Sequence, residues 1–125
     1  MSASRAAGPL APVHVPKPWG YEIVWARTER YAGKILHVRA GESLSLQYHE
    51  HKEETLRVLT GTLTLEVGGE GEEQRMLRLG PGEGWHIPPG TRHRLTAIED
   101  VDVIEVSTPE LDDVVRLEDR YGRVK

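Results

Sequence analysis

The sequence contains no cysteine. This absence excludes disulfide bonds, thiolate metal ligands and a cysteine nucleophile, so any metal ion must be bound through nitrogen and oxygen atoms. The lack of cysteine is also compatible with a reducing compartment. A location in the cytoplasm is therefore expected.

Long apolar runs and an excess of positive charge are missing as well. The apolar patch near the start is broken by Gly8, Pro9 and Pro12, unlike the continuous core of a signal peptide. No run approaches the roughly 20 residues of a membrane-spanning helix. The formal net charge is −4 and the Lys and Arg residues are scattered along the chain, which disfavours nucleic acid as a partner. We expect neither a membrane nor a nucleic-acid partner.

The length of 125 residues corresponds to one domain. Residues 1–18 are rich in Ala, Pro and Ser and show no periodicity, which predicts a disordered or loosely packed arm. We expect a single folded domain over residues 19–125.

The rest of the composition favours β-structure, because thirteen Gly and eight Pro suit short strands joined by tight turns. One helical turn is expected at 109–115. The profile predicts an all-β fold, a small jelly-roll barrel with antiparallel strands. Strands are expected at 21–26, 32–40, 44–51, 56–59, 62–67, 74–79, 84–87, 92–98 and 101–107.

The most informative stretch runs from residue 41 to residue 61. Its first part alternates with period two, so one strand face is expected to carry Gln47, His49 and His51. Glu54 follows within a few residues, and His93 comes after a Pro-Pro-Gly turn in a second block, 80–95. Imidazoles, a carboxylate and an amide oxygen that converge on one point predict a metal site.

The opposite face of this strand carries Leu44, Leu46 and Tyr48. If the ligand face looks into a barrel, this apolar face needs separate cover. A second sheet layer, the N-terminal arm or a partner subunit would supply it. We take this face as an indication of a homodimer.

The spacing in the first block resembles the first motif of the cupin family, G-x5-H-x-H-x3or4-E-x6-G. The fit places Gln47-x-His49 where the family usually has H-x-H. Five residues then separate Gly41 from Gln47, four separate His49 from Glu54, and six separate Glu54 from Gly61. His51 becomes an extra histidine on the same strand face.

The second block resembles the second cupin motif, G-x5-P-x-G-x2-H-x3-N. It fits through Gly82, Pro88, Gly90 and His93 and has Ala97 where Asn is usual. The resemblance implies a cupin fold and four metal ligands, namely Gln47, His49, Glu54 and His93.

A narrower resemblance is carried by longer segments. The pair Gln47-x-His49 is similar to the Gln-x-His of mannose-6-phosphate isomerases. KPWGYE from Lys17, LSLQYHEHKEET from Leu44, IPPGTRHRL from Ile87 and RLEDRYGR from Arg116 resemble the C-terminal cupin domain of type II mannose-6-phosphate isomerase and mannose-1-phosphate guanylyltransferase proteins. The sequence has neither the nucleotidyltransferase half nor a G-x4-G-K-[ST] loop, so synthesis of GDP-mannose is not expected of these residues.

This resemblance implies metal-dependent aldose–ketose isomerisation of a small-molecule substrate, a sugar phosphate. The metal would be divalent (Zn, Mn, Fe, Co or Ni), and the ligand types do not choose among these ions. His51 is the first candidate for the proton shuttle, because its unperturbed pKa of ~6.5 suits transfer in both directions. Glu54 would take this catalytic role if it is not a ligand.

A cationic clamp for the phosphate is expected among the basic residues. Arg92 and Arg94 flank His93, and one of the two is expected to reach the pocket, with Arg94 as the preferred catalytic candidate. Lys17 and Arg123 are the other candidates.

Two other functions are compatible with the same ligands. One is a different metal-dependent cupin enzyme, such as a dioxygenase. The other is a module that binds a sugar or a metal without catalysis, which a fully ligated metal with no open position would favour.

Overall fold

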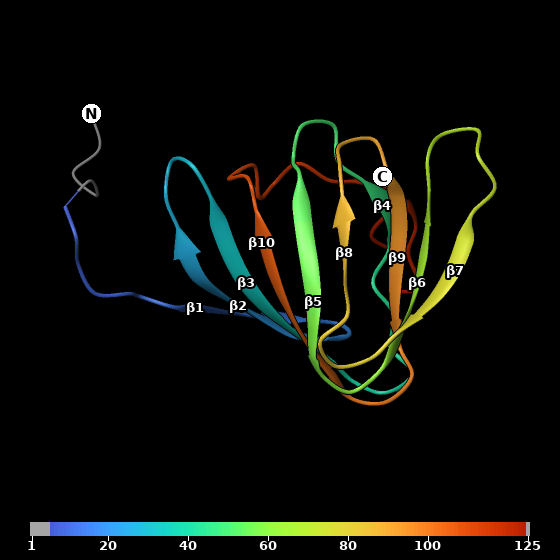
Figure 1. The fold of residues 1–125 in the computed structure, drawn as a ribbon, viewed down its shortest axis with the longest axis horizontal. Coiled ribbons are helices and arrows are strands. Elements are labelled where there is room, and N and C mark those ends of the chain that lie inside the picture. Colours follow the sequence, from blue (N-terminus) through green and yellow to red (C-terminus); the bar gives the residue numbers. More distant parts are fainter. Residues whose placement is uncertain (1–5, 125) are drawn as a thin grey trace.

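The computed structural model describes residues 6–124, which form eleven strands in two antiparallel sheets (Figure 1). The first sheet has the order β1 (Val13–Lys17), β2 (Gly20–Arg27), β3 (Ala32–Val38), β10 (Val101–Ser107), β5 (Glu54–Thr60) and β8 (Gly84–Ile87). The second has the order β11 (Val115–Glu118), β4 (Leu46–Tyr48), β9 (Arg92–Ala97), β6 (Leu63–Gly68) and β7 (Arg75–Leu79). The predicted all-β, antiparallel architecture is confirmed. Residues 6–124 include no helix long and apolar enough to cross a membrane.

The core lies between the two sheets and follows from strand alternation. In β10 and β6 every second residue is buried, because successive side chains of a strand point to opposite faces. The resulting layer of Leu63, Leu65, Val101 and Val103 is completely buried. Leu65 of this layer also lines a cavity whose other lining residues include charged side chains.

A tight turn links the second block to the first. Gly90 adopts φ 83° in the turn between β8 and β9, a conformation that glycine adopts with little strain. Its amide donates a hydrogen bond to the carbonyl of His49 (2.8 Å). The Pro-Pro-Gly turn is therefore joined directly to the segment that follows β4, and His93 comes into β9 three residues later.

Only part of the predicted loose arm, residues 1–18, lacks regular structure. Residues 6–12 are exposed and have no strand structure, and residues 1–5 lie outside the described part. Val13–Lys17, however, form β1, which pairs with β2 along its whole length. This strand was not predicted because it contains Pro16, and proline disfavours strands. Proline is tolerated at the edge of a sheet, which is where β1 lies.

The predicted helical turn at 109–115 is wrong. Residues 109–114 form bends and turns, and β11 begins at Val115. Tertiary contacts keep this segment out of a helix, because Asp113 accepts hydrogen bonds from the loop after β4 through both its side chain and its main chain.

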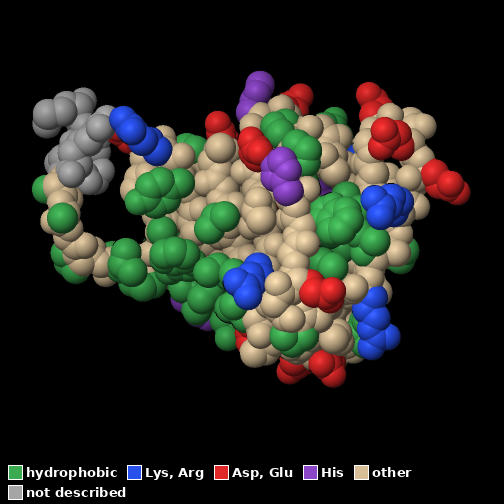
Figure 2. All heavy atoms as spheres, viewed as in Figure 1, with side chains coloured by type: hydrophobic (Ala, Val, Ile, Leu, Met, Phe, Trp, Pro, Cys, Tyr) green, Lys and Arg blue, Asp and Glu red, His purple; other side chains and the backbone are tan. Residues whose placement is uncertain are grey.

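The outer surface carries exposed hydrophobic residues that are relevant to the predicted homodimer. On the face shown in Figure 2, Lys and Arg side chains are scattered among acidic ones, and hydrophobic side chains gather near the arm. Leu10, Val13 and Tyr31 are 65%, 56% and 55% exposed. The homodimer stays a prediction, and light scattering tests it because a 14.0 kDa monomer would contradict it.

Candidate metal centre

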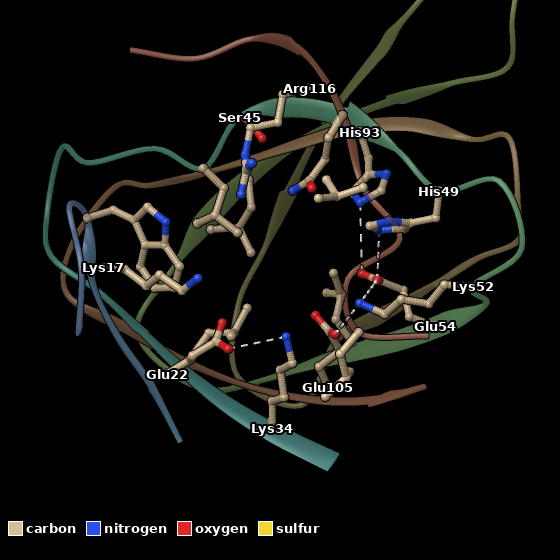
Figure 3. Close-up of a pocket in the computed structure, with 18 of the residues that line it drawn as sticks. Lys17, Glu22, Lys34, Ser45, His49, Lys52, Glu54, His93, Glu105 and Arg116 are labelled. Atoms are coloured by element: carbon tan, nitrogen blue, oxygen red, sulfur yellow. Dashed lines mark hydrogen bonds and ion pairs between the residues drawn. The ribbon is translucent and has the colours of Figure 1, made fainter. Parts of the chain in front are cut away.

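Three of the four predicted ligands come together between the sheets. His49 follows β4, Glu54 begins β5 and His93 lies on β9, and each is only 5% exposed. One ligand atom from each lies within 4.8 Å of the others. Figure 3 shows the three side chains pointing toward one another at one side of a cavity. The spacing of the two sequence blocks therefore predicted three groups that lie close enough to hold a metal ion.

The fourth predicted ligand, Gln47, lines the same cavity. Gln47 on β4 is the cross-strand partner of His93 on β9, and directly paired residues project from the same face of a sheet. Its amide is thus directed to the side of the sheet that carries His93.

Main-chain carbonyls fix the orientation of both imidazoles. Nδ1 of His49 lies 2.6 Å from the carbonyl oxygen of Asp113, and Nδ1 of His93 lies 2.9 Å from that of Thr91. A carbonyl only accepts hydrogen bonds, so Nδ1 of each ring donates. This arrangement leaves Nε2 of each ring available to a metal ion, as in metal sites whose other ring nitrogen is held by a carbonyl.

Both Nε2 atoms face the carboxylate of Glu54. The distances are 3.1 Å from His49 Nε2 to Oε1 and 3.8 Å from His93 Nε2 to Oε2. Lone pairs on nitrogen and oxygen repel at such distances, so a positive species, either a proton or a metal ion, is needed between them. Two imidazole nitrogens and one carboxylate oxygen form a donor set that suits Zn, Mn, Fe, Co or Ni. The residues fit the predicted divalent ion.

The ionisation of these groups agrees with metal binding. Burial alone would raise the pKa of the Glu54 carboxyl, but hydrogen bonding to His49 and the charge of Lys52 outweigh it and hold the pKa at about 2. Burial lowers the pKa of His93. Near neutral pH Glu54 is therefore anionic and His93 is neutral, which are the forms that bind metals.

A buried ion-pair network that sequence reasoning missed adjoins the triad. Nζ of Lys52 lies 3.2 Å from Glu54 Oε1 and 3.2 Å from Glu105 Oε2, and both Lys52 and Glu105 are buried. Val101, Val103 and Glu105 are two residues apart in β10, so they share one strand face. This spacing would have indicated that Glu105 points inward with the two valines. No comparable signal marks Lys52.

His51 is not brought to the site, so its expected place on the ligand face is wrong. β4 ends at Tyr48, and residues 50 and 51 form a bend. His51 is exposed, and Lys52 instead is buried at the cavity. The period-two pattern fails because it holds only while the chain stays extended.

Arg94 and Arg92 are not at the site either, which corrects the expectation that one of them reaches the pocket. Residues two apart in a strand share a face, so both lie opposite to His93. Arg94 pairs with Glu66 (3.0 Å) and Glu118 (3.2 Å), and Arg92 pairs with Glu70 (3.4 Å). The other two predicted cations, Lys17 and Arg123, do line the cavity.

The cavity extends from the triad to further charged groups between the sheets (Figure 3). Its wall contains apolar side chains, among them Trp19, Leu36, Leu44, Leu56, Leu65 and Leu95. Its polar lining includes Lys17, Glu22, Lys34, Ser45, Gln47, Lys52, Glu105, Arg116 and Arg123. Such a concave site with a few polar groups is the usual form of a small-molecule site.

Residues 10–119 match the family model described as mannose-6-phosphate isomerase C-terminal. The chain belongs to this family. Mannose-1-phosphate guanylyltransferase ManC of Salmonella typhimurium is 43% identical over 116 residues, which are 88% of this chain and 23% of that protein. Xanthan biosynthesis protein XanB of Xanthomonas campestris is 35% identical, over 87% of this chain and 23% of that protein. This member of the family thus spans less than a quarter of the length of these relatives.

Solved structures show the same cupin fold. KdgF from Halomonas sp. superposes with a TM-score of 0.67 at 28% identity, over 77% of this chain and 85% of that one. Oxalate decarboxylase from Bacillus subtilis superposes with a TM-score of 0.76 at 17% identity, over 85% of this chain and 30% of that one. The predicted cupin jelly roll is confirmed, and the second likeness concerns the fold alone.

Proposed function

We propose that this family member binds a divalent metal ion through His49, Glu54, His93 and Gln47 and interconverts an aldose phosphate and a ketose phosphate. The observation that carries the proposal is the buried triad, in which Nε2 of both histidines faces the Glu54 carboxylate inside a cavity. The match to a mannose-6-phosphate isomerase family model supports the substrate class.

The bound ion would supply polarisation of neighbouring carbonyl and hydroxyl oxygens of the sugar. The protein must then move a proton between adjacent carbons. Since His51 lies outside the cavity, we assign this transfer to Glu105, which lines the cavity and is held by Lys52 (3.2 Å). A carboxylate oxygen of Glu105 would take the proton from one carbon and return it to its neighbour, while the hydroxyl proton moves to the former carbonyl oxygen.

The cavity walls contribute by excluding water. Apolar side chains such as Leu56, Leu65 and Leu95 surround the polar groups, and the low local dielectric strengthens electrostatic interactions with the substrate. The carbonyls of Asp113 and Thr91 keep the two imidazoles oriented before the substrate arrives.

The decisive test is interconversion of mannose 6-phosphate and fructose 6-phosphate by metal-stripped protein reloaded separately with Zn, Mn, Co, Fe or Ni. We expect turnover with at least one ion, and its loss in His93→Ala. His86→Ala is the matched control, because His86 is an exposed histidine that pairs with the exposed Glu53 and is not part of the triad. Stoichiometric metal binding without turnover for any ion would reject the isomerase and favour a binding module or another cupin chemistry.

A further inference from the structure

We propose that Lys17 and Arg116 form an anion subsite that binds the phosphate group of the substrate inside the cavity. This inference rests on the proposed function for the identity of the whole substrate, but the anion subsite can be tested without catalysis. It also replaces Arg94, the clamp that the sequence favoured, with a residue on a different strand.

The argument begins with the charge balance of the cavity. Five cationic side chains line it, but three are already neutralised by carboxylates. Lys34 lies 3.3 Å from Glu22 Oε2, and Lys52 lies 3.2 Å from both Glu54 and Glu105. Arg123 is held by Asp119 through contacts of 2.8 Å and 3.1 Å.

The remaining two cations have no such partner. Within residues 6–124, neither Lys17 nor Arg116 forms an ion pair with a carboxylate. Nε of Arg116 is moreover buried and makes no hydrogen bond. A buried donor without an acceptor is destabilising, and a ligand that supplies an acceptor would remove that cost.

The topology directs Arg116 into the cavity. Arg116 on β11 is the cross-strand partner of Gln47 on β4, and Gln47 is the partner of His93 on β9. The three residues thus form one row across the sheet, with side chains on the same face. Figure 3 shows the Arg116 side chain extending toward the interior of the cavity.

Lys17 approaches from the other sheet. It ends β1 and lines the cavity together with Glu22 and Lys34, and Figure 3 shows its ammonium group facing the cavity. Burial lowers the pKa of Lys17, and the positive charges of Lys34, Arg123 and Arg116 lower it further while Glu22 opposes them. Lys17 from the first sheet and Arg116 from the second thus line the same cavity.

The number of unpaired charges favours a phosphate over a carboxylate. A phosphoryl group carries about −1.5 to −2 at neutral pH and offers three acceptor oxygens, whereas a carboxylate carries one negative charge. Lys17 and Arg116 together supply two positive charges, and arginine binds phosphate oxygens through a planar fork of donors. With the phosphate beside Arg116, the row through Gln47 to His93 would direct the other end of the sugar to the triad.

The test is calorimetric binding to metal-stripped protein, since the anion subsite does not need the metal. The probes are inorganic phosphate, mannose 6-phosphate, unphosphorylated mannose and acetate. We expect mannose 6-phosphate and phosphate to compete with each other, and mannose and acetate to bind at least about tenfold more weakly. Equal binding of mannose and mannose 6-phosphate by the wild type would overturn the proposal without any variant.

Variants that remove the positive charge of Lys17 or Arg116 test whether these two residues bind the phosphate. Lys17→Gln and Arg116→Gln are each expected to weaken phosphate binding about tenfold or more, and Arg116→Lys to weaken it less. Arg94→Gln is the control, because Arg94 pairs with Glu66 and Glu118 outside the cavity. Folded Lys17→Gln and Arg116→Gln proteins that bind phosphate like the wild type would overturn the proposal. Phosphate binding that depends on both residues would support it even if no isomerase activity is found.

Discussion

The side chain of His49 and the main chain of Asp113 are joined by a hydrogen bond of 2.6 Å from Nδ1 to the carbonyl oxygen. The carboxylate of Asp113 accepts three further hydrogen bonds, from the amides of Glu50 (3.0 Å), His51 (2.7 Å) and Lys52 (2.9 Å). Asp113 therefore orients His49, one of the three clustered side chains, and holds the loop that turns Lys52 into the cavity.

We expect Asp113→Asn to loosen this loop and weaken metal binding. The amide group has only one acceptor oxygen, so at least one of the three amides of residues 50–52 would lose its partner. The loss should cost about 0.5–1.5 kcal/mol of folding free energy, because Glu50 and His51 are exposed and their amides can bind water instead, and about 10–100-fold in metal affinity. Competition with a chelator and urea denaturation measure the two effects. Asp112→Asn, in an exposed neighbour, is the control, and equal metal affinities of the two variants would contradict the assignment.

The same carboxylate predicts a loss of stability in acid. Burial alone would raise the pKa of Asp113, but the three amides outweigh it and lower the pKa from 3.8 to about 2. A carboxyl whose pKa is lower in the folded state stabilises the fold above its unfolded pKa, and this contribution disappears as pH falls through the folded value. The contribution of Asp113 should be complete above about pH 5 and decline toward pH 2. Urea midpoints across this range should fall less steeply for Asp113→Asn, and identical slopes would reject the prediction.

Metal binding should raise the thermal stability of the protein. A ligand that binds only the folded state stabilises it by about 2.7 kcal/mol at a concentration 100 times its dissociation constant. We expect a rise in Tm on addition of the binding ion to the wild type and none for His93→Ala. His51→Ala should respond like the wild type, because His51 is exposed and outside the triad. A His51→Ala protein that no longer responds to metal would restore His51 as a ligand.

Glu105→Gln separates catalysis from metal binding. Glu105 contacts Lys52 but is not one of the three clustered ligands. If it moves the proton, removing its charge should lower kcat by about 10²–10⁴-fold, the usual contribution of a general acid–base group, with metal affinity much less affected. Steady-state kinetics with a parallel metal titration measure both quantities, and Glu99→Gln, on an exposed loop, is the control. A kcat close to the wild-type value would remove Glu105 from the mechanism.

The clustering of His49, Glu54 and His93 is predictable from the sequence because it depends on short-range information. The intervals between Gly41, Gln47, His49 and Glu54, and the Pro-Gly turn before His93, specify turns and alternating strand faces that neighbouring residues largely control. For the same reason most strands were found close to their observed bounds. Strand parity also places Arg94 on the face opposite to His93, so the sequence itself excludes Arg94 from the site.

The other half of the cavity depends on contacts between distant segments. Arg116 enters it because β11 pairs with β4 in a register that aligns Arg116 with Gln47, and no local pattern near residue 116 specifies that register. His51 leaves the site because the carboxylate of Asp113, 62 positions away, bends the chain there. Residue spacing thus identifies the groups that come together as a possible metal site, whereas the packing of β11 against β4 places Arg116 in the cavity beside them.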